Sequence, residues 1–167
     1  ISGSTAHEPD AKPYAWQAGL RAVQRHLDRM GIAGTAYPGE RSGTYRIVRK
    51  VAPHLRISVV IPTRGTTGLI WGEWRVMVVE TVRSVLARTR HTDVEIVIVY
   101  DEPTPAAVLD ELKELVGDRL VLVPFLEPFN FSAKCNVGFI ASSGDVVIFL
   151  NDDMQAVTDG CLEQLAA

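Results

Sequence analysis

Four short apolar runs, separated by stretches with helical spacing, constrain the fold of this chain more than any other feature. The runs are Ile57–Ile61, Val94–Tyr100, Leu120–Phe125 and Asp145–Leu150. Each has the length of a strand and is apolar enough to be covered on both faces, as strands of a parallel sheet are. The alternation predicts an α/β fold with a Rossmann-like, mostly parallel sheet flanked by helices and right-handed crossovers.

A smaller segment, residues 1–53, is expected to precede the main domain of residues 54–167. Apolar residues recur every three or four positions over Tyr14–Met30, which predicts a helix. Thr44–Arg49 is expected to form a short strand, and the intervening residues 35–43 are rich in turn-forming types. The segment is therefore predicted to be a helix-plus-strand module that leads into the sheet domain.

Helices are expected between the apolar runs of the main domain. The first is predicted at residues 73–88, after a glycine-bracketed loop, and its apolar stripe consists of Trp74, Val78, Val82 and Leu86. The second covers residues 106–116, where Pro105 suits the first turn. The third follows the loop Asn130–Ser132 and runs to about Ser142.

Composition narrows the class of protein. With 47% hydrophobic and 22% charged residues the chain is globular, and its net charge of −3 argues against a nucleic-acid partner. No apolar run approaches the roughly 20 residues of a transmembrane helix. Cys135 and Cys161 lack metal-ligand spacing, so we expect buried free thiols in a reducing compartment. Because the chain begins at Ile1 and stops at Ala167 within a predicted helix, we expect a piece of a longer protein.

Polar residues follow three of the predicted strands at the point where each ends. These ends are Pro62-Thr63-Arg64, Asp101-Glu102 and Asn151-Asp152-Asp153. The carboxyl ends of parallel strands meet at one edge of a sheet, which is where open α/β sheets bind ligands. A site assembled from several strand ends is typical of a nucleotide pocket.

Asp152 and Asp153 are candidate ligands for a hard cation such as Mg²⁺ or Mn²⁺. One carboxylate, diphosphate oxygens and water would complete an octahedron, whereas zinc is disfavoured because no His or Cys accompanies the acids. Aspartate is also common in turns, so a pair of surface-turn aspartates is an equally open interpretation.

The other candidate residues also have two interpretations. Asp101 could accept a hydrogen bond from a base or ribose, or belong to an ordinary Pro-rich turn. Asn130 or Ser132 is suited to cap the next helix, whose amino end would attract phosphate, with Lys134 adding positive charge. No P-loop, no G-x-G-x-x-G after the first strand and no G-x-S-x-G is present, which disfavours the corresponding enzyme classes.

Taken together, the three strand ends resemble family-two glycosyltransferases, which are inverting enzymes of GT-A fold. Residues 57–64 resemble the opening strand of that family, and residues 95–101 resemble its second strand, which ends in an acid that recognises the base. The stretch containing Asn136, Gly138 and Gly144 resembles the segment leading to the family's D-x-D metal motif. Residues 7–50 are similar to the linking segment that precedes such a domain in some bacterial, particularly actinobacterial, transferases.

The resemblance implies transfer of a sugar from a nucleoside-diphosphate sugar to a polysaccharide, lipid-linked or other hydroxyl acceptor, by direct displacement with a divalent metal. It implies Asp153 as the metal ligand, and a general base in an acceptor half that this chain lacks, so the piece alone is expected to be inactive. The parent is expected in the cytoplasm, either free or at the inner face of the membrane. The residues implied to bind the nucleotide sugar are Pro62, Thr63, Arg64, Asp101, Asn130, Lys134, Asn151 and Asp152.

The sequence departs from the family pattern at two strand ends. Asn151 stands where the first acid of D-x-D is often found, and Tyr100-Asp101-Glu102-Pro103 replaces an acid pair followed by Gly and Ser. Two alternatives therefore stay open. One is a sugar-phosphate nucleotidyltransferase, and the other is a non-catalytic module that self-associates through an uncovered sheet edge, which exposure of Trp71 and Trp74 would support.

Overall fold

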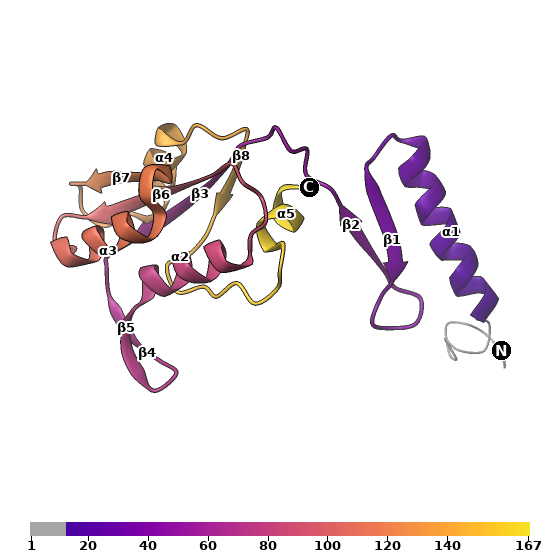
Figure 1. The fold of residues 1–167 in the computed structure, drawn as a ribbon, viewed down its shortest axis with the longest axis horizontal. Helices are drawn as coiled ribbons and strands as arrows, with labels where there is room; N and C mark the ends of the chain where they lie inside the picture. The colour runs from indigo at the N-terminus through magenta and orange to yellow at the C-terminus, as the bar shows by residue number, and fades with distance from the viewer. Residues whose placement is uncertain (1–12) are drawn as a thin grey trace. The chain divides into compact units, whose positions relative to one another are not determined.

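The computed structural model describes residues 13–167, which form two compact units that divide at Val51 (Figure 1). The first unit contains the helix α1 (Pro13–Arg29) and an antiparallel pair of strands, β1 (Gly34–Pro38) and β2 (Tyr45–Arg49). The helix and β2 confirm the prediction. Strand β1 lies where turns were expected. Its side chains do not alternate between polar and apolar, so the sequence pattern did not indicate a strand, and the strand forms because its backbone pairs with β2.

The second unit is the predicted α/β domain. Its sheet has the strand order β7-β6-β3-β8 with every neighbouring pair parallel, as the alternation of strands and helices predicted. In chain order its elements are β3 (Ile57–Thr63), β4 (Thr67–Ile70), β5 (Glu73–Val76), α2 (Met77–Arg88), β6 (Val94–Asp101), α3 (Ala106–Val116), the short 3₁₀ helix Gly117–Arg119, β7 (Leu120–Phe125), α4 (Phe131–Ala141), β8 (Val146–Phe149) and α5 (Cys161–Ala166).

Both faces of the sheet are covered, which explains why the strands read as continuous apolar runs. Val59 and Ile61 of β3 lie in the larger core, beneath α2, α3 and α5, and Val60 between them lies in a smaller core beneath α4. Figure 1 shows α4 on one side of the sheet and α2 and α3 on the other. Seven successive buried residues in β3 make this strand the centre of the domain.

Helix α4 approaches the sheet closely because of a glycine. A Cβ atom added to Gly138 would overlap the side chain of Val60 and lie 2.9 Å from that of Val99. Ala133, Val137 and Ala141 complete the small-residue stripe that packs on this face. The tight packing fixes the helix against β3 and β6, and therefore also fixes the loop that precedes it at the carboxyl edge.

The first predicted helix of the domain begins later than expected. Residues 67–76 form an antiparallel hairpin of β4 and β5, and α2 starts only at Met77. Trp74, assigned to the apolar stripe, lies on β5 and is 75% exposed. The helical spacing of apolar residues continued into residues that instead pair with β4, and periodicity alone cannot detect such a partner.

A polar cluster ties the amino ends of the strands together. The hydroxyl of Ser58 donates to Glu95 at 2.7 Å, and the backbone N–H and hydroxyl of Ser143 donate to the same carboxylate at 2.9 and 2.7 Å. Burial raises the pKa of Glu95, but these hydrogen bonds, aided by the charge of Arg56, outweigh burial and hold that pKa below its ordinary value. The cluster therefore depends on an ionised Glu95.

The two cysteines are free, as predicted, but half-buried where full burial was expected. Cys135 lies off the stripe of α4 that packs on the sheet, so protein atoms cover only part of its side chain. Burial raises the pKa of both Cys135 and Cys161. Among the described residues, no helix has the length and apolar character needed to span a membrane.

Candidate functional site

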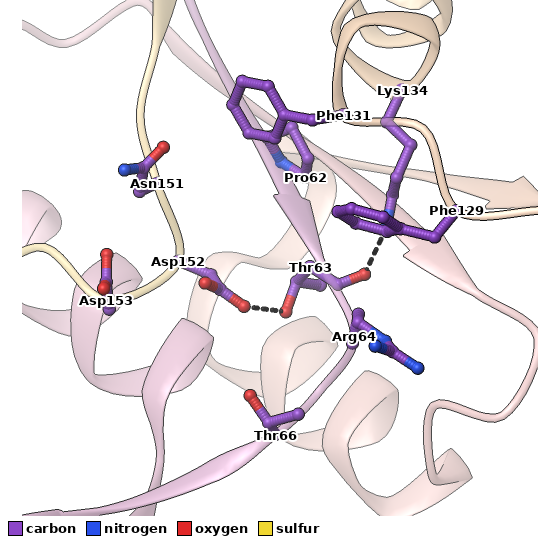
Figure 2. A pocket seen from close by; sticks show the side chains of 10 residues that line it. All are labelled: Pro62, Thr63, Arg64, Thr66, Phe129, Phe131, Lys134, Asn151, Asp152 and Asp153. Atoms are coloured by element: carbon purple, nitrogen blue, oxygen red, sulfur yellow. Dashed lines mark hydrogen bonds between the residues drawn. The ribbon is translucent and has the colours of Figure 1, made fainter.

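A pocket of about 280 Å³ lies at the carboxyl edge of the sheet, where the sequence predicted a site (Figure 2). We call it the central pocket. It is lined by the end of β3, the loop before α4 and the segment after β8. Its residues are Pro62, Thr63, Arg64, Thr66, Phe129, Phe131, Lys134, Asn151, Asp152 and Asp153.

Asp152 is tethered to the end of β3. The hydroxyl of Thr63 donates to Asp152 Oδ2 at 2.6 Å and accepts from the N–H of Gly65 at 3.0 Å. The hydroxyl of Thr81 on α2 lies 2.7 Å from the carbonyl of Asp152 and 2.8 Å from that of Met154. The segment after β8 is thus held by contacts to both β3 and α2. One oxygen of the Asp152 carboxylate already accepts a hydrogen bond, from Thr63.

Asp153 differs from its neighbour. Figure 2 shows Asp152 turned toward Thr63, whereas Asp153 makes no such contact. Within residues 13–167 its exposed carboxylate has no hydrogen bond or ion pair. It lines the central pocket and also a second pocket beside the β4–β5 hairpin. Asp153 is therefore a carboxylate that is held on a fixed segment and is available to a ligand.

Lys134 is among the residues around the central pocket, but its side chain is completely buried. Its ammonium group donates to the carbonyl of Thr63 at 2.6 Å and to Asp101 Oδ1 at 2.9 Å. It also lies 5.9 and 5.8 Å from the ring centres of Phe125 and Phe129, within cation–π range. The ammonium group thus bridges the ends of β3 and β6 by hydrogen bonds. Because protein groups enclose it, it stabilises the arrangement of the two strand ends.

Asp101 lines a neighbouring pocket of about 190 Å³, which we call the Asp101 pocket. Its side chain is 14% exposed, and Arg64 Nε lies 3.4 Å from Asp101 Oδ2 while the guanidinium stacks over Phe129. Arg64 and Phe129 line both pockets, so the two pockets adjoin at these side chains. The Asp101 pocket is lined by Arg64, Asp101, Glu102, Pro103, Phe125, Leu126, Glu127 and Phe129.

The remaining sequence candidates fall in two groups. Asn130 caps α4, since its Oδ1 accepts from the N–H of Ala133 at 3.0 Å, and it does not line the central pocket. Asn151 lies on the pocket wall with its side chain exposed. Sequence reasoning missed Phe129 and Phe131, although two aromatic residues flanking a capping Asn were visible. Their exposed rings, 60% and 48%, form the apolar part of the pocket.

The chain belongs to a known enzyme family. The model of "Glycosyl transferase family 2" matches residues 58–167, which include all three strand ends of the site. This confirms the family-two resemblance inferred from the motifs of the main domain, whereas the likeness of residues 7–50 to an actinobacterial linking segment stays a prediction.

Two curated relatives cover almost the whole chain. The chain is 30% identical over 170 residues to the uncharacterized protein y4gI of Sinorhizobium fredii, and the match covers 99% of this chain and 18% of that protein. It is 30% identical over 154 residues to the O-antigen biosynthesis protein RfbC of Myxococcus xanthus, covering 92% of this chain and 11% of RfbC. The chain therefore spans less than a fifth of the length of these relatives.

A solved structure supports the fold. The mannosyltransferase PcManGT from Pyrobaculum calidifontis, determined in complex with GDP-Man and Mn²⁺, matches with a TM-score of 0.54 and 16% identity over 93% of this chain and 41% of that one. At this level of identity the match establishes the shared GT-A-like architecture.

Proposed function

We propose that this chain carries the donor-binding part of a glycosyltransferase that transfers a sugar from a nucleoside-diphosphate sugar to an acceptor hydroxyl. The observation that carries the proposal is the central pocket itself. It is built from separate strand ends of a family 2 domain, and it presents the unpaired carboxylate of Asp153 next to the tethered Asp152. The O-antigen biosynthesis relative favours a polysaccharide acceptor for the whole protein.

The base and ribose would occupy the Asp101 pocket and its junction with the central pocket. Phe129 offers a ring on which a base can stack, and the remaining lone pairs of Asp101 can accept a hydrogen bond from it. Arg64, whose side chain is 66% exposed, can turn from Asp101 toward a diphosphate. Pro62 and Thr63 would form the floor, and Asn151 and Asp152 the wall.

Lys134 and Asn130 would act without direct contact to the donor. The buried ammonium of Lys134 orients the Asp101 carboxylate and the Thr63 carbonyl. Asn130 fixes the start of α4 and hence the loop that carries Phe129 and Phe131. Both are positioning residues in this proposal.

The carboxylate oxygens of the site fit a hard divalent cation such as Mn²⁺ or Mg²⁺, which the protein and the bound nucleotide sugar would hold jointly. Among the described residues no three His, Cys, Asp or Glu side chains gather as a metal site, so the protein would supply Asp153 and the diphosphate the other oxygens. When bound, such an ion neutralises charge on the departing diphosphate. The mannosyltransferase neighbour, solved with Mn²⁺, agrees with this choice.

In this proposal, acceptor binding and the general base belong to other parts of the parent protein. The two curated relatives are at least five times longer than the region that matches this chain, which leaves room for such parts. The residues that line the central pocket and the Asp101 pocket would bind and orient the donor. Activity is therefore expected from the parent.

Titration calorimetry with UDP, GDP and dTDP, each with and without Mn²⁺, tests the proposal. We expect one of the three to bind, more tightly with Mn²⁺ than without. A folded protein that binds none of them refutes the assignment of a donor site. Release of pyrophosphate from a nucleoside triphosphate and a sugar phosphate would instead indicate a nucleotidyltransferase.

A further inference from the structure

The β4–β5 hairpin turns through a strained tryptophan. Trp71 and Gly72 connect the strands with φ values of 50° and 84°, both in the left-handed region, as a two-residue type I′ turn requires. Asn-Gly is the usual pair in such turns, whereas a bulky residue in this region is strained because its Cβ crowds the backbone. A strained residue of this kind is a reason to look for a function of its side chain.

The ring of Trp71 is both exposed and held in place. It is 65% exposed, and the guanidinium of Arg75 lies 5.6 Å from its centre. Arg75 is itself fixed by Glu73 at 2.6 Å and Glu80 at 3.4 Å. Trp74 on the same hairpin is more exposed, and among the described residues no cation lies over its ring. The hairpin therefore presents one oriented aromatic surface.

Trp71 lines the second pocket that Asp153 shares, which has a volume of about 150 Å³ and which we call the hairpin pocket. Trp71 provides an aromatic surface, while Asp153 and Gln155 are polar groups without a partner among the described residues. Pyranose rings have apolar C–H faces and hydroxyl edges, so this combination suits a sugar. The lining residues are Ile70, Trp71, Met77, Glu80, Thr81, Asp153, Met154 and Gln155.

The three pockets follow one another along the sheet edge. The Asp101 pocket shares Arg64 and Phe129 with the central pocket, and the central pocket shares Asp153 with the hairpin pocket. A nucleoside-diphosphate sugar has the same linear order: base and ribose, then diphosphate, then sugar. We infer that the hairpin pocket receives the transferred sugar of the donor and that Trp71 stacks on its ring, an inference that rests on the proposed function.

Calorimetry on the full-length protein with Mn²⁺ tests the inference by comparing each diphosphate with its sugar conjugate. The probes are UDP and UDP-glucose, GDP and GDP-mannose, and dTDP and dTDP-glucose. Trp71→Asn removes the ring but supplies the residue that a type I′ turn favours, so the hairpin is expected to fold. The matched control is Trp74→Ala, because Trp74 lies on the same hairpin and does not line the pocket.

We expect Trp71→Asn to weaken binding of the preferred sugar nucleotide about tenfold, which corresponds to about 1.4 kcal/mol, and to leave binding of the free diphosphate unchanged. Trp74→Ala should change neither. Unchanged binding of the sugar nucleotide in Trp71→Asn overturns the inference, as does an equal loss for diphosphate and conjugate, or an effect on the acceptor KM alone. If the unsubstituted protein binds no diphosphate, the proposed function fails and the inference fails with it.

Discussion

Replacing Lys134 with methionine would test how the site is supported. Methionine has a similar length and no charge, so it fills the space while removing both hydrogen bonds of the ammonium group. The carbonyl of Thr63 would lose its 2.6 Å partner, and Asp101 would lose its 2.9 Å partner while staying only 14% exposed. The substitution therefore leaves a carboxylate in place with only the weaker contact to Arg64.

The expected cost follows from these contacts. A charge-assisted hydrogen bond contributes about 1.5–3 kcal/mol and a neutral one about 1 kcal/mol. Removing one member of a buried pair costs about 3–5 kcal/mol, and Arg64 at 3.4 Å places this case near the lower end. We expect Lys134→Met to lower the free energy of unfolding by about 3 kcal/mol, which for a domain of this size lowers Tm by roughly 6–12 °C.

Urea unfolding followed by circular dichroism measures this cost, and a double-mutant cycle identifies its origin. Adding Asp101→Asn to Lys134→Met removes the uncompensated charge, so the double variant should be more stable than the sum of the single effects predicts. Lys113→Met is the control, because its ion pair with Asp110 is exposed and contributes less than about 1 kcal/mol. A cost below about 1 kcal/mol for Lys134→Met, or strict additivity in the cycle, would refute the reasoning.

Two further predictions concern the scaffold. The lowered pKa of Glu95 means that its ionised form stabilises the fold above its unfolded pKa of about 4.5 and that this contribution is lost as pH falls through the lower folded pKa. Glu95→Gln should thus be less stable by about 1 kcal/mol at pH 7, with a gap that narrows as pH falls below about 4.5; a gap independent of pH would contradict this. Gly138→Ala should destabilise by about 1–2 kcal/mol in urea unfolding, because overpacking against Val60 exceeds the gain in helix propensity, and an unchanged or raised stability would contradict the close approach of α4.

Much of the sheet could be predicted because its strands are short apolar runs bounded by turn residues. The bounds of α3 and β7 agree with the prediction at every residue. The hairpin was missed because Trp74, four positions before Val78 of α2, continues the helical spacing backward into residues whose backbone pairs with β4. Strand β1 was missed for a related reason: the order of polar and apolar residues in β1 does not indicate that its backbone pairs with β2.

The site was predictable in outline from topology, because parallel strands bring their carboxyl ends together. The sequence could not distinguish Asp152 from Asp153 by contact, since the difference depends on a hydroxyl 89 positions away in the chain. It also gave no sign that the Lys134 ammonium group is buried between β3 and β6, where it donates to Thr63 and Asp101. Such assignments depend on contacts between segments far apart in the sequence, which no local pattern gives.

The most direct test of the central claim is the effect of Asp153→Ala on nucleoside-diphosphate binding with and without Mn²⁺. The control is Asp110→Ala, an exposed carboxylate on α3 that lines none of the three pockets. We expect Asp153→Ala to abolish the gain in affinity that Mn²⁺ gives the unsubstituted protein, and Asp110→Ala to retain it. An Asp153→Ala protein that keeps the full Mn²⁺-dependent gain would contradict the account.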